Sequence, residues 1–191
     1  MNFFVTIRIK MNNFILRTAL RSEAAALSAL MATVFWDTYQ ADNTPENMRD
    51  YMQKAFGVAQ QTAELADPHR VTFVVERQGA LIAYAQLSDR YSEPTASAEL
   101  PENGLFLSRF YVHQDWHGKG IAFLLLQKCE EYAQRKSATA IWFTVWQENK
   151  KAIAFYTKHG FEVFGTANFA VGDDLQIDWL MQKIIKEKCL K

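Results

Sequence analysis

Cysteine is scarce in this chain. Cys129 and Cys189 are its two cysteines, and they lie far apart in the sequence. They predict neither a disulfide framework nor a cysteine metal cluster, and a cytoplasmic protein is the simplest interpretation. The four histidines lack the spacing that zinc ligands share, so no metal chemistry is expected.

Net charge and long hydrophobic runs are missing as well. The 21 basic residues balance the 21 acidic ones, so the chain lacks the basic excess that is typical of nucleic-acid-binding proteins. No apolar run approaches the roughly 20 residues that span a bilayer, and residues 1–10 carry no small-residue cleavage site of a signal peptide. We therefore expect neither a nucleic acid nor a membrane as a partner.

Hydrophobic residues are plentiful, at 49% of a chain of 191 residues. Such a chain can bury the core of one domain. The few glycines and prolines mark no linker, and no internal repeat is visible, so residues 1–191 are expected to form a single domain. Residues 1–12 add little to the pattern and are expected to be an N-terminal extension, with Met11 as a second candidate for the start of the chain.

Hydrophobic periodicity predicts a series of strands and helices. The expected strands cover residues 14–17, 71–77, 81–88, 105–112, 138–146, 161–169 and 176–184. The expected helices cover residues 22–39, 44 to about 66, 121–135 and 149–159. Residues 92–103 are polar and contain two prolines, which predicts a surface loop. This order is typical of a mixed α/β fold with helices on the faces of a sheet.

The clearest motif is a glycine turn between a strand and a helix. The segment His117-Gly-Lys-Gly-Ile-Ala122 follows the strand that ends at Val112. Glycines at such a turn let the backbone approach a ligand, and its N–H groups together with the positive end of a helix suit a phosphate or pyrophosphate. A tight turn without a ligand would explain the glycines as well. The spacing differs from that of a nucleotide-binding P-loop, which we set aside.

A second motif follows one strand later. Asn149 stands where a helix N-cap belongs, Ala152 and Tyr156 share one helix face, and Gly160 follows the expected helix end. Taken alone, these features also fit an ordinary helix with a capping asparagine and a tyrosine packed in the core.

Together the two motifs resemble the GCN5-related N-acetyltransferases, the GNAT family. Gly120 and Ala122 match the last two fixed positions of the family's phosphate-loop pattern Arg/Gln-x-x-Gly-x-Gly/Ala, whereas His117 stands where the family has Arg or Gln. The family's later pattern is met at Asn149, Ala152, Tyr156, Gly160 and Phe161. The resemblance covers the chain from about residue 14. It implies a mixed, mostly antiparallel sheet of six to seven strands flanked by four helices.

One branch of the family is similar in two further segments. These are Phe35-Trp-Asp-Thr-Tyr39 and residues 171–178, Val-Gly-Asp-Asp-Leu-Gln-Ile-Asp. The branch is that of the bacterial Pai-type spermidine/spermine N-acetyltransferases. This likeness places polyamines among the candidate acceptors.

The resemblance implies acetyl transfer from acetyl-CoA to a primary amine, and it implies where the cofactor binds. In the family the strand before the turn splays from the next one, so the pantetheine arm lies along it like an added strand. A neutral histidine offers one N–H donor where arginine offers five, so a weaker pyrophosphate contact is expected at position 117. The cofactor-binding residues expected on these grounds are Phe110, Tyr111, Val112, His117, Gly118, Lys119, Gly120, Ile121, Ala122 and Asn149. For Lys119, a solvated turn lysine is an equal alternative.

Tyr156 is the expected catalytic residue. Its phenol can protonate the thiolate of departing coenzyme A. No general base stands out, and a chain of water molecules is an alternative. Acceptor contacts are expected from Asp37, Tyr39 and Arg109. A polyamine would need converging carboxylates, for which the chain offers Asp37, Asp42, Glu46, Asp173 and Asp174, although acidic residues in solvated loops are common.

Three functions remain compatible with the sequence. The leading one is a cytoplasmic N-acetyltransferase for a small-molecule amine. A second keeps the chemistry but acetylates a protein or an aminoglycoside. A third is a CoA-binding regulatory module, which His117 favours and which Tyr156 and Asn149 oppose. A homodimer is a candidate assembly, because exposed strand ends in this fold often pair.

Overall fold

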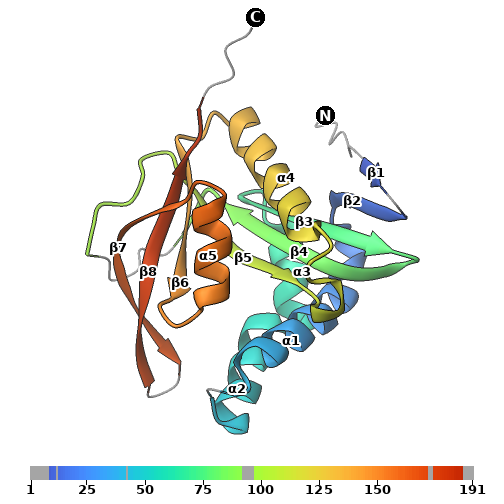
Figure 1. The fold of residues 1–191 in the computed structure, drawn as a ribbon. Helices are drawn as coiled ribbons and strands as arrows, with labels where there is room; N and C mark the ends of the chain where they lie inside the picture. Colours follow the sequence, from blue (N-terminus) through green and yellow to red (C-terminus); the bar gives the residue numbers. More distant parts are fainter. Residues whose placement is uncertain (1–8, 12, 42, 92–96, 172–173, 187–191) are drawn as a thin grey trace, which may run out of the picture. The chain divides into compact units, whose positions relative to one another are not determined.

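A computed structural model describes residues 9–11, 13–41, 43–91, 97–171 and 174–186 (Figure 1). The chain divides into two compact units, which we describe separately. The first unit comprises Met1–Gln86 and Arg109–Cys129, and the second comprises Leu87–Ser108 and Glu130–Lys191. The single domain expected from the sequence stays a prediction.

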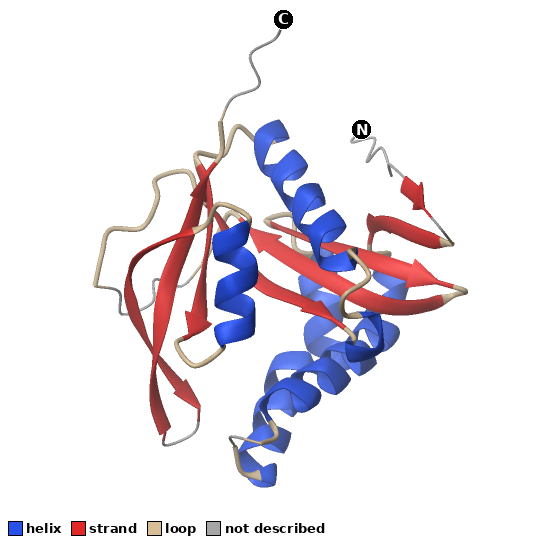
Figure 2. Cartoon of the chain, in the orientation of Figure 1, coloured by secondary structure: helices blue, strands red, loops and turns tan. Residues whose placement is uncertain are grey.

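The first unit combines one run of strands with several helices (Figure 2). Its strands are β1 (Ile9–Met11), β2 (Phe14–Thr18), β3 (Arg70–Arg77), most of β4 (Ala80–Ser88) and the C-terminal half of β5 (Leu105–Val112). Its helices are α1 (Ala24–Tyr39), α2 (Pro45–Phe56), α3 (Val58–Ala66) and most of α4 (Ile121–Arg135). The strands lie in chain order, and β2 runs antiparallel to both β1 and β3.

Helical periodicity explains how α1 contributes to the core of this unit. Leu27, Leu30, Met31 and Val34 recur at the spacing of one helix face, and all four side chains are buried. They pack in one cluster with residues of α2, β3 and β4, including Tyr84. The helix that the sequence predicted over residues 22–39 is confirmed as α1.

Gly57 interrupts what the sequence predicted as one continuous helix from Thr44 to about Ala66. Its ψ angle of 149° ends α2, and α3 begins at the next residue. A Cβ at Gly57 would lie 2.8 Å from the carbonyl oxygen of Gln53. The expectation of an unbroken helix is therefore wrong, because the backbone leaves the helical conformation at Gly57. The short distance to Gln53 explains why a residue without a side chain stands at this position.

The second unit combines a group of strands with one complete helix. Its elements are the first residues of β5, β6 (Ala140–Trp146), α5 (Lys150–Lys158), β7 (Glu162–Val171) and β8 (Asp174–Ile184). Strand β6 pairs in parallel with β5 at Leu105 and Phe106, and antiparallel with β8, which in turn pairs antiparallel with β7.

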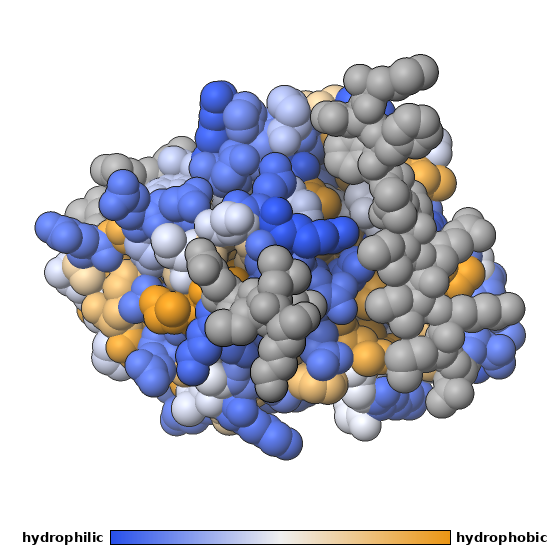
Figure 3. All heavy atoms as spheres, turned by 90° about the horizontal axis from the view of Figure 1, so that it is seen from above, coloured by the Kyte–Doolittle hydropathy of each residue, from blue (hydrophilic) through white to orange (hydrophobic). Residues whose placement is uncertain are grey.

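The strand order confirms the predicted fold class, a mixed and mostly antiparallel sheet with helices. Over the described residues the order is β1-β2-β3-β4-β5-β6-β8-β7, which is eight strands. The three-residue β1 falls within the segment expected as an N-terminal extension, and the other seven strands are those that the sequence predicted. The face drawn in Figure 3 carries mainly hydrophilic residues with smaller hydrophobic patches. None of the described helices has the length and apolar character that crossing a bilayer requires.

The break at Gly57 makes a direct prediction about stability. Gly57→Ala should lower the free energy of unfolding by about 1–3 kcal/mol, because the added methyl group meets a backbone oxygen that cannot move aside easily. Urea denaturation measures the change. Val58→Ala, at a side chain that is 50% exposed, is the control and should change stability by less than about 0.5 kcal/mol. Equal midpoints for Gly57→Ala and the unmodified chain would contradict this explanation of the break.

Candidate active site

The predicted glycine turn joins β5 to α4 in the first unit. A 3₁₀ turn at Gln114–Trp116 leads to Gly118 and Gly120, whose φ angles are +73° and +79°. Glycine adopts this left-handed conformation without strain. A Cβ at either position would meet nothing within 4 Å. Both glycines are exposed, so an incoming group can approach the backbone here.

Helix α4 begins directly after this turn. The first N–H groups of an α-helix have no partner within the helix, and they lie at its positive end. The side chain of Ile121, the first residue of α4, is buried at 2% exposure. Its contribution to a ligand site would therefore come from the backbone, which is how amides bind phosphate at helix N-termini.

The imidazole of His117 points back toward the end of β5. Its Nε2 lies 2.8 Å from the carbonyl oxygen of Val112, so this nitrogen carries the proton and donates it. The one N–H of a neutral His117 is thus used within the protein. The contact of His117 with phosphate that the sequence predicted stays untested.

Two cationic side chains lie over the ring of Trp116, next to the glycine turn. The Lys119 ammonium lies 4.3 Å from the centre of the Trp116 ring and donates to the carbonyl oxygen of Asp115 over 2.7 Å. The guanidinium of Arg77 lies 4.4 Å from the same ring. Lys119 is therefore held at the turn by two interactions, in a place where its charge favours an anion.

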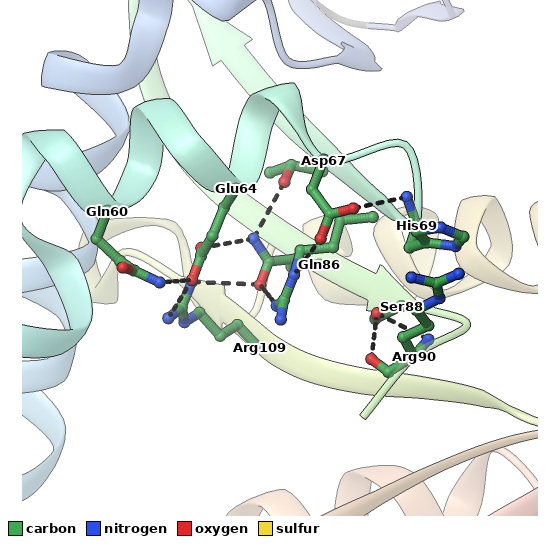
Figure 4. A network of polar contacts seen from close by, with 10 residues as sticks. Gln60, Glu64, Asp67, His69, Gln86, Ser88, Arg90 and Arg109 are labelled. Carbon is green, nitrogen blue, oxygen red and sulfur yellow. Dashed lines mark hydrogen bonds and ion pairs between the residues drawn. The ribbon is translucent and has the colours of Figure 1, made fainter. Parts of the chain in front are cut away.

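Arg109 lies on β5, one residue before the predicted cofactor-binding stretch. Its guanidinium forms a bidentate ion pair with Glu64 of α3, and it also donates to the carbonyl oxygen of Ala55 over 3.0 Å and to Gln86 over 3.2 Å (Figure 4). Both charged side chains are largely buried, with 15% and 6% exposure. The structure thus places Arg109 in an internal network, and its predicted contact with the acceptor stays untested.

The same network fixes the charge of Glu64. Burial alone would raise the pKa of this carboxyl group. The ion pair with Arg109 and hydrogen bonds from Gln86 and Gln60 outweigh that effect, so the pKa is lowered. Glu64 is therefore ionised at neutral pH, and its charge is balanced by Arg109.

Tyrosine side chains gather beside this network. Tyr84 of β4 and Tyr111 of β5 stack with their ring centres 5.6 Å apart, and Tyr39 of α1 shares a hydrogen bond with Tyr111. Burial is the main reason why the pKa values of Tyr84 and Tyr111 are raised. Their phenols stay protonated at neutral pH and cannot serve there as bases. Asp37, two residues before Tyr39, lies on another face of α1.

The second unit holds the other predicted motif. Tyr156 of α5 is 6% exposed, and its ring centre lies 4.2 Å from that of Phe143. Asn149 caps α5, because its side-chain oxygen accepts from the N–H of Ala152 over 3.1 Å. The structure thus shows the capping role of Asn149, while its predicted contact with pantetheine and the catalytic role of Tyr156 stay untested.

The structure describes only some of the carboxylates that a polyamine would need. Asp42 and Asp173 lie outside the described residues, and the side chain of Asp174 is not described either. Glu46 is exposed in the first turn of α2. The predicted acidic cluster is therefore untested.

Asp178 of β8 is a candidate that the sequence reasoning missed. It is 5% exposed, and its atom Oδ1 is buried without a hydrogen-bond partner. The hydroxyl of Thr144 donates to this carboxyl group, but burial is the larger effect and raises its pKa. A carboxylate at an inward position of an apolar strand, between Ile177 and Leu180, is the signal that could have identified it.

An open glycine turn before a helix, at the end of a strand in a mixed sheet, is suited to binding the phosphate of a cofactor. Residues 30–161 match the model of the Acetyltransferase (GNAT) family. The chain belongs to the GNAT family and is an N-acetyltransferase that uses acetyl-CoA.

Similar proteins agree with this assignment. The chain is 28% identical over 157 residues to an uncharacterized N-acetyltransferase in the pepI 3′ region of Lactobacillus delbrueckii subsp. lactis, covering 82% of this chain and 89% of that protein. Its fold resembles that of the PaiA N-acetyltransferase from Thermoplasma acidophilum in complex with coenzyme A, with a TM-score of 0.72, 18% identity, and coverage of 90% and 98%. A chimera of the Vibrio cholerae spermidine N-acetyltransferase SpeG and hSSAT matches with a TM-score of 0.63, 20% identity, and coverage of 91% and 96%.

The glycine turn predicts a loss of cofactor binding in one variant. Gly120→Val should abolish acetyl-CoA binding measured by calorimetry, because a side chain would stand where phosphate must reach the backbone. Gly79→Val is the matched control: Gly79 has a φ angle of +83°, and a Cβ there also meets nothing within 4 Å, but it lies in the turn between β3 and β4. The control should keep its affinity. Binding by Gly120→Val at the original affinity would refute the location of the site.

The buried ion pair predicts a pH-dependent loss of stability. Glu64→Gln should cost about 3–5 kcal/mol at neutral pH, because it leaves the charge of Arg109 buried without its partner. Since the folded-state pKa of Glu64 is lowered, its contribution is present above the unfolded-state pKa of about 4.3 and is lost as the pH falls through the folded-state pKa.

Thermal unfolding followed by circular dichroism measures this effect. The difference in Tm between the two proteins should shrink as the pH falls below about 4. The control is Glu46→Gln, at an exposed residue. A gap in Tm that is the same at every pH would contradict the role of the ionised pair.

Proposed function

We propose that this enzyme transfers the acetyl group of acetyl-CoA to the primary amine of a small molecule. The observation that carries the proposal is the group of tyrosines on β5 and its neighbours. Tyr111 belongs to the stretch expected to hold the pantetheine arm, and its hydroxyl shares a hydrogen bond with Tyr39. Tyr84 is fully buried in the core of the first unit, so the tyrosines that a small acceptor could meet are the half-buried Tyr39 and Tyr111. An extended basic peptide would instead need unpaired carboxylates.

The cofactor would be bound mainly by backbone groups. The backbone of Phe110–Val112 would accept the pantetheine arm as an added strand. The amides of residues 118–122 would surround the pyrophosphate, with Lys119 supplying positive charge. This arrangement explains how a family member can work with His117 in place of arginine.

The reaction would proceed by direct attack. An amine with a pKa near 10 is mostly protonated at pH 7, and forming the neutral nucleophile costs about 4 kcal/mol. The neutral amine nitrogen attacks the thioester carbonyl, the C–S bond breaks, and the thiolate of coenzyme A takes a proton from the phenol of Tyr156. The nitrogen releases its extra proton to water, and the Tyr156 phenolate regains a proton from water, so the protons balance.

Polyamines are one candidate class of acceptor. They are supported by the similarity to the Pai-type branch and by the fold shared with PaiA and with the spermidine N-acetyltransferase chimera. Against them, the buried carboxylate of Glu64 is already paired with Arg109. The cytoplasmic location and the homodimer stay predictions.

An acceptor panel tests the proposal. Thiol release from acetyl-CoA would be followed with a chromogenic disulfide in the presence of spermidine, tyramine, kanamycin and a lysine-rich peptide. Turnover with spermidine or tyramine, confirmed by the mass of the acetylated product, is the expected result. Turnover confined to the peptide would contradict the small-molecule acceptor, and confinement to kanamycin would favour an aminoglycoside.

The phenol of Tyr156 makes a separate prediction. Tyr156→Phe should lower kcat at least ~10-fold and leave the affinity for acetyl-CoA unchanged, because it removes the proton donor and keeps the packed ring. Tyr91→Phe is the control, since the Tyr91 ring packs 4.7 Å from that of Trp142 in the same unit. An unchanged kcat for Tyr156→Phe would exclude the phenol as the acid.

A further inference from the structure

We propose that Arg77 binds the 3′-phosphate of coenzyme A and is held beside the glycine turn by the ring of Trp116. The inference rests on the cofactor location given under the proposed function, with the pyrophosphate at the amides of residues 118–122. It assigns the remaining phosphate of the cofactor, which the glycine turn does not take. It does not depend on which amine the enzyme acetylates.

The strand order brings the end of β3 close to the glycine turn within the first unit. Strand β4 lies between β3 and β5 (Figure 1). The N–H of His113, just after β5, donates to the carbonyl oxygen of Ile82, near the start of β4, over 2.9 Å. The β3–β4 turn therefore lies beside the end of β5, and Arg77 is the last residue of β3. The contact proposed for Arg77 comes from its side chain and adds no hydrogen bond to the backbone of that turn.

The side chain of Arg77 is held against two aromatic rings. Its guanidinium carbon lies 4.4 Å from the centre of the Trp116 ring and 5.6 Å from that of Phe14. The two rings meet edge to face with their centres 5.4 Å apart. Trp116 also carries the ammonium group of Lys119 at 4.3 Å. A single ring thus links the guanidinium to a residue of the glycine turn, and cation–π attraction fixes both charges in place.

The N–H groups of Arg77 have no acceptor within the described part of the chain. Its Nε atom is buried without a hydrogen-bond partner, and no carboxylate of the described residues pairs with its guanidinium. Glu76, the preceding residue, points to the other face of β3 and pairs with Arg17 over 2.6 Å. The other arginines on the strands of this unit, Arg17, Arg70 and Arg109, each pair with a carboxylate. An arginine without such a partner suits a ligand that brings its own negative charge.

A purely structural role for Arg77 would explain its contacts less well. Leaving a buried N–H donor unpaired costs more free energy than a cation–π contact at a half-exposed site returns. An apolar side chain would pack against both rings without that cost. The carboxylate of Asp115, next to Trp116 in the sequence, lies 3.6 Å from Nδ1 of His113, so it does not supply the missing partner. The guanidinium is better explained by a ligand.

The 3′-phosphate has the chemistry that this position requires. A phosphate monoester carries a charge of about −1.5 to −2 at pH 7 and three acceptor oxygens. A guanidinium binds two such oxygens through parallel N–H groups while its flat faces stack on aromatic rings. The pyrophosphate already has the amides and the helix end as donors. Arg77 comes from a different strand, so it is placed for a phosphate further along the cofactor.

Two forms of the cofactor test the assignment: acetyl-CoA and acetyl-dephospho-CoA, which lacks only the 3′-phosphate. Calorimetry on the full chain measures both dissociation constants. The unmodified enzyme should bind acetyl-CoA at least ~10-fold more tightly, as expected for a charge-assisted contact. Arg77→Gln should weaken acetyl-CoA binding by at least ~10-fold and should change the affinity for acetyl-dephospho-CoA by less than ~2-fold.

The ratio of the two affinities separates a phosphate contact from a packing role. Poorer packing in Arg77→Gln would weaken both cofactors by the same factor and leave the ratio unchanged. Arg77→Lys keeps the charge but not the fork, so its ratio should fall between those of the unmodified enzyme and Arg77→Gln. If Arg77→Gln does not fold, Arg77→Lys carries the same test. Lys54→Gln removes one positive charge from an exposed residue of α2 and should leave both affinities unchanged.

Two results would overturn the inference: equal weakening of both cofactors in the Arg77 variants, or the original acetyl-CoA affinity in Arg77→Gln. The first would assign Arg77 to packing or to the pyrophosphate, and the second would remove it from the cofactor site. Failure of the proposed function shows elsewhere. An enzyme that acetylates none of the panel amines has the wrong acceptor class, and these binding constants do not change with that outcome.

Discussion

The buried pair of Arg109 and Glu64 is the interaction on which the first unit depends. It ties α3 to β5 at the residue before the stretch expected to bind the cofactor. Because side chains alternate along a strand, Arg109 and Tyr111 share one face, and the residues between and after them point to the other. One face of β5 is thus anchored to α3 by the ion pair, to β4 by the stacking of Tyr111 on Tyr84, and to α1 by the hydrogen bond with Tyr39. This fixes the backbone of the stretch that is proposed to bind pantetheine.

Local patterns in the sequence predicted most of the elements because burial follows their periodicity. Strand β3 and helix α1 were found in this way. The break at Gly57 was not, since glycine also occurs inside helices and the clash with Gln53 depends on how the chain turns there. Glu64 was not expected in the interior, because its partner Arg109 lies 45 residues further along the chain.

In the candidate site, too, features set by local geometry were predicted and features set by tertiary contacts were not. The glycine turn and the capping role of Asn149 depend on short-range geometry, and the sequence predicted both. The rotation of His117 toward Val112 and the burial of Asp178 depend on tertiary contacts, so no spacing rule reveals them. The identity of the acceptor is harder still to predict from the sequence. Contacts with acetyl-CoA are shared by the family, whereas acceptor contacts come from side chains that vary within one fold.

Hydrogen exchange of the full chain, with and without acetyl-CoA, tests the central claim most directly. The claim is that backbone amides of residues 110–122 hold the cofactor, so exchange in this segment should slow on binding while the β3–β4 turn at Gln78 and Gly79 is unaffected. Saturating acetyl-CoA that binds by calorimetry but leaves exchange in residues 110–122 unchanged would contradict the account.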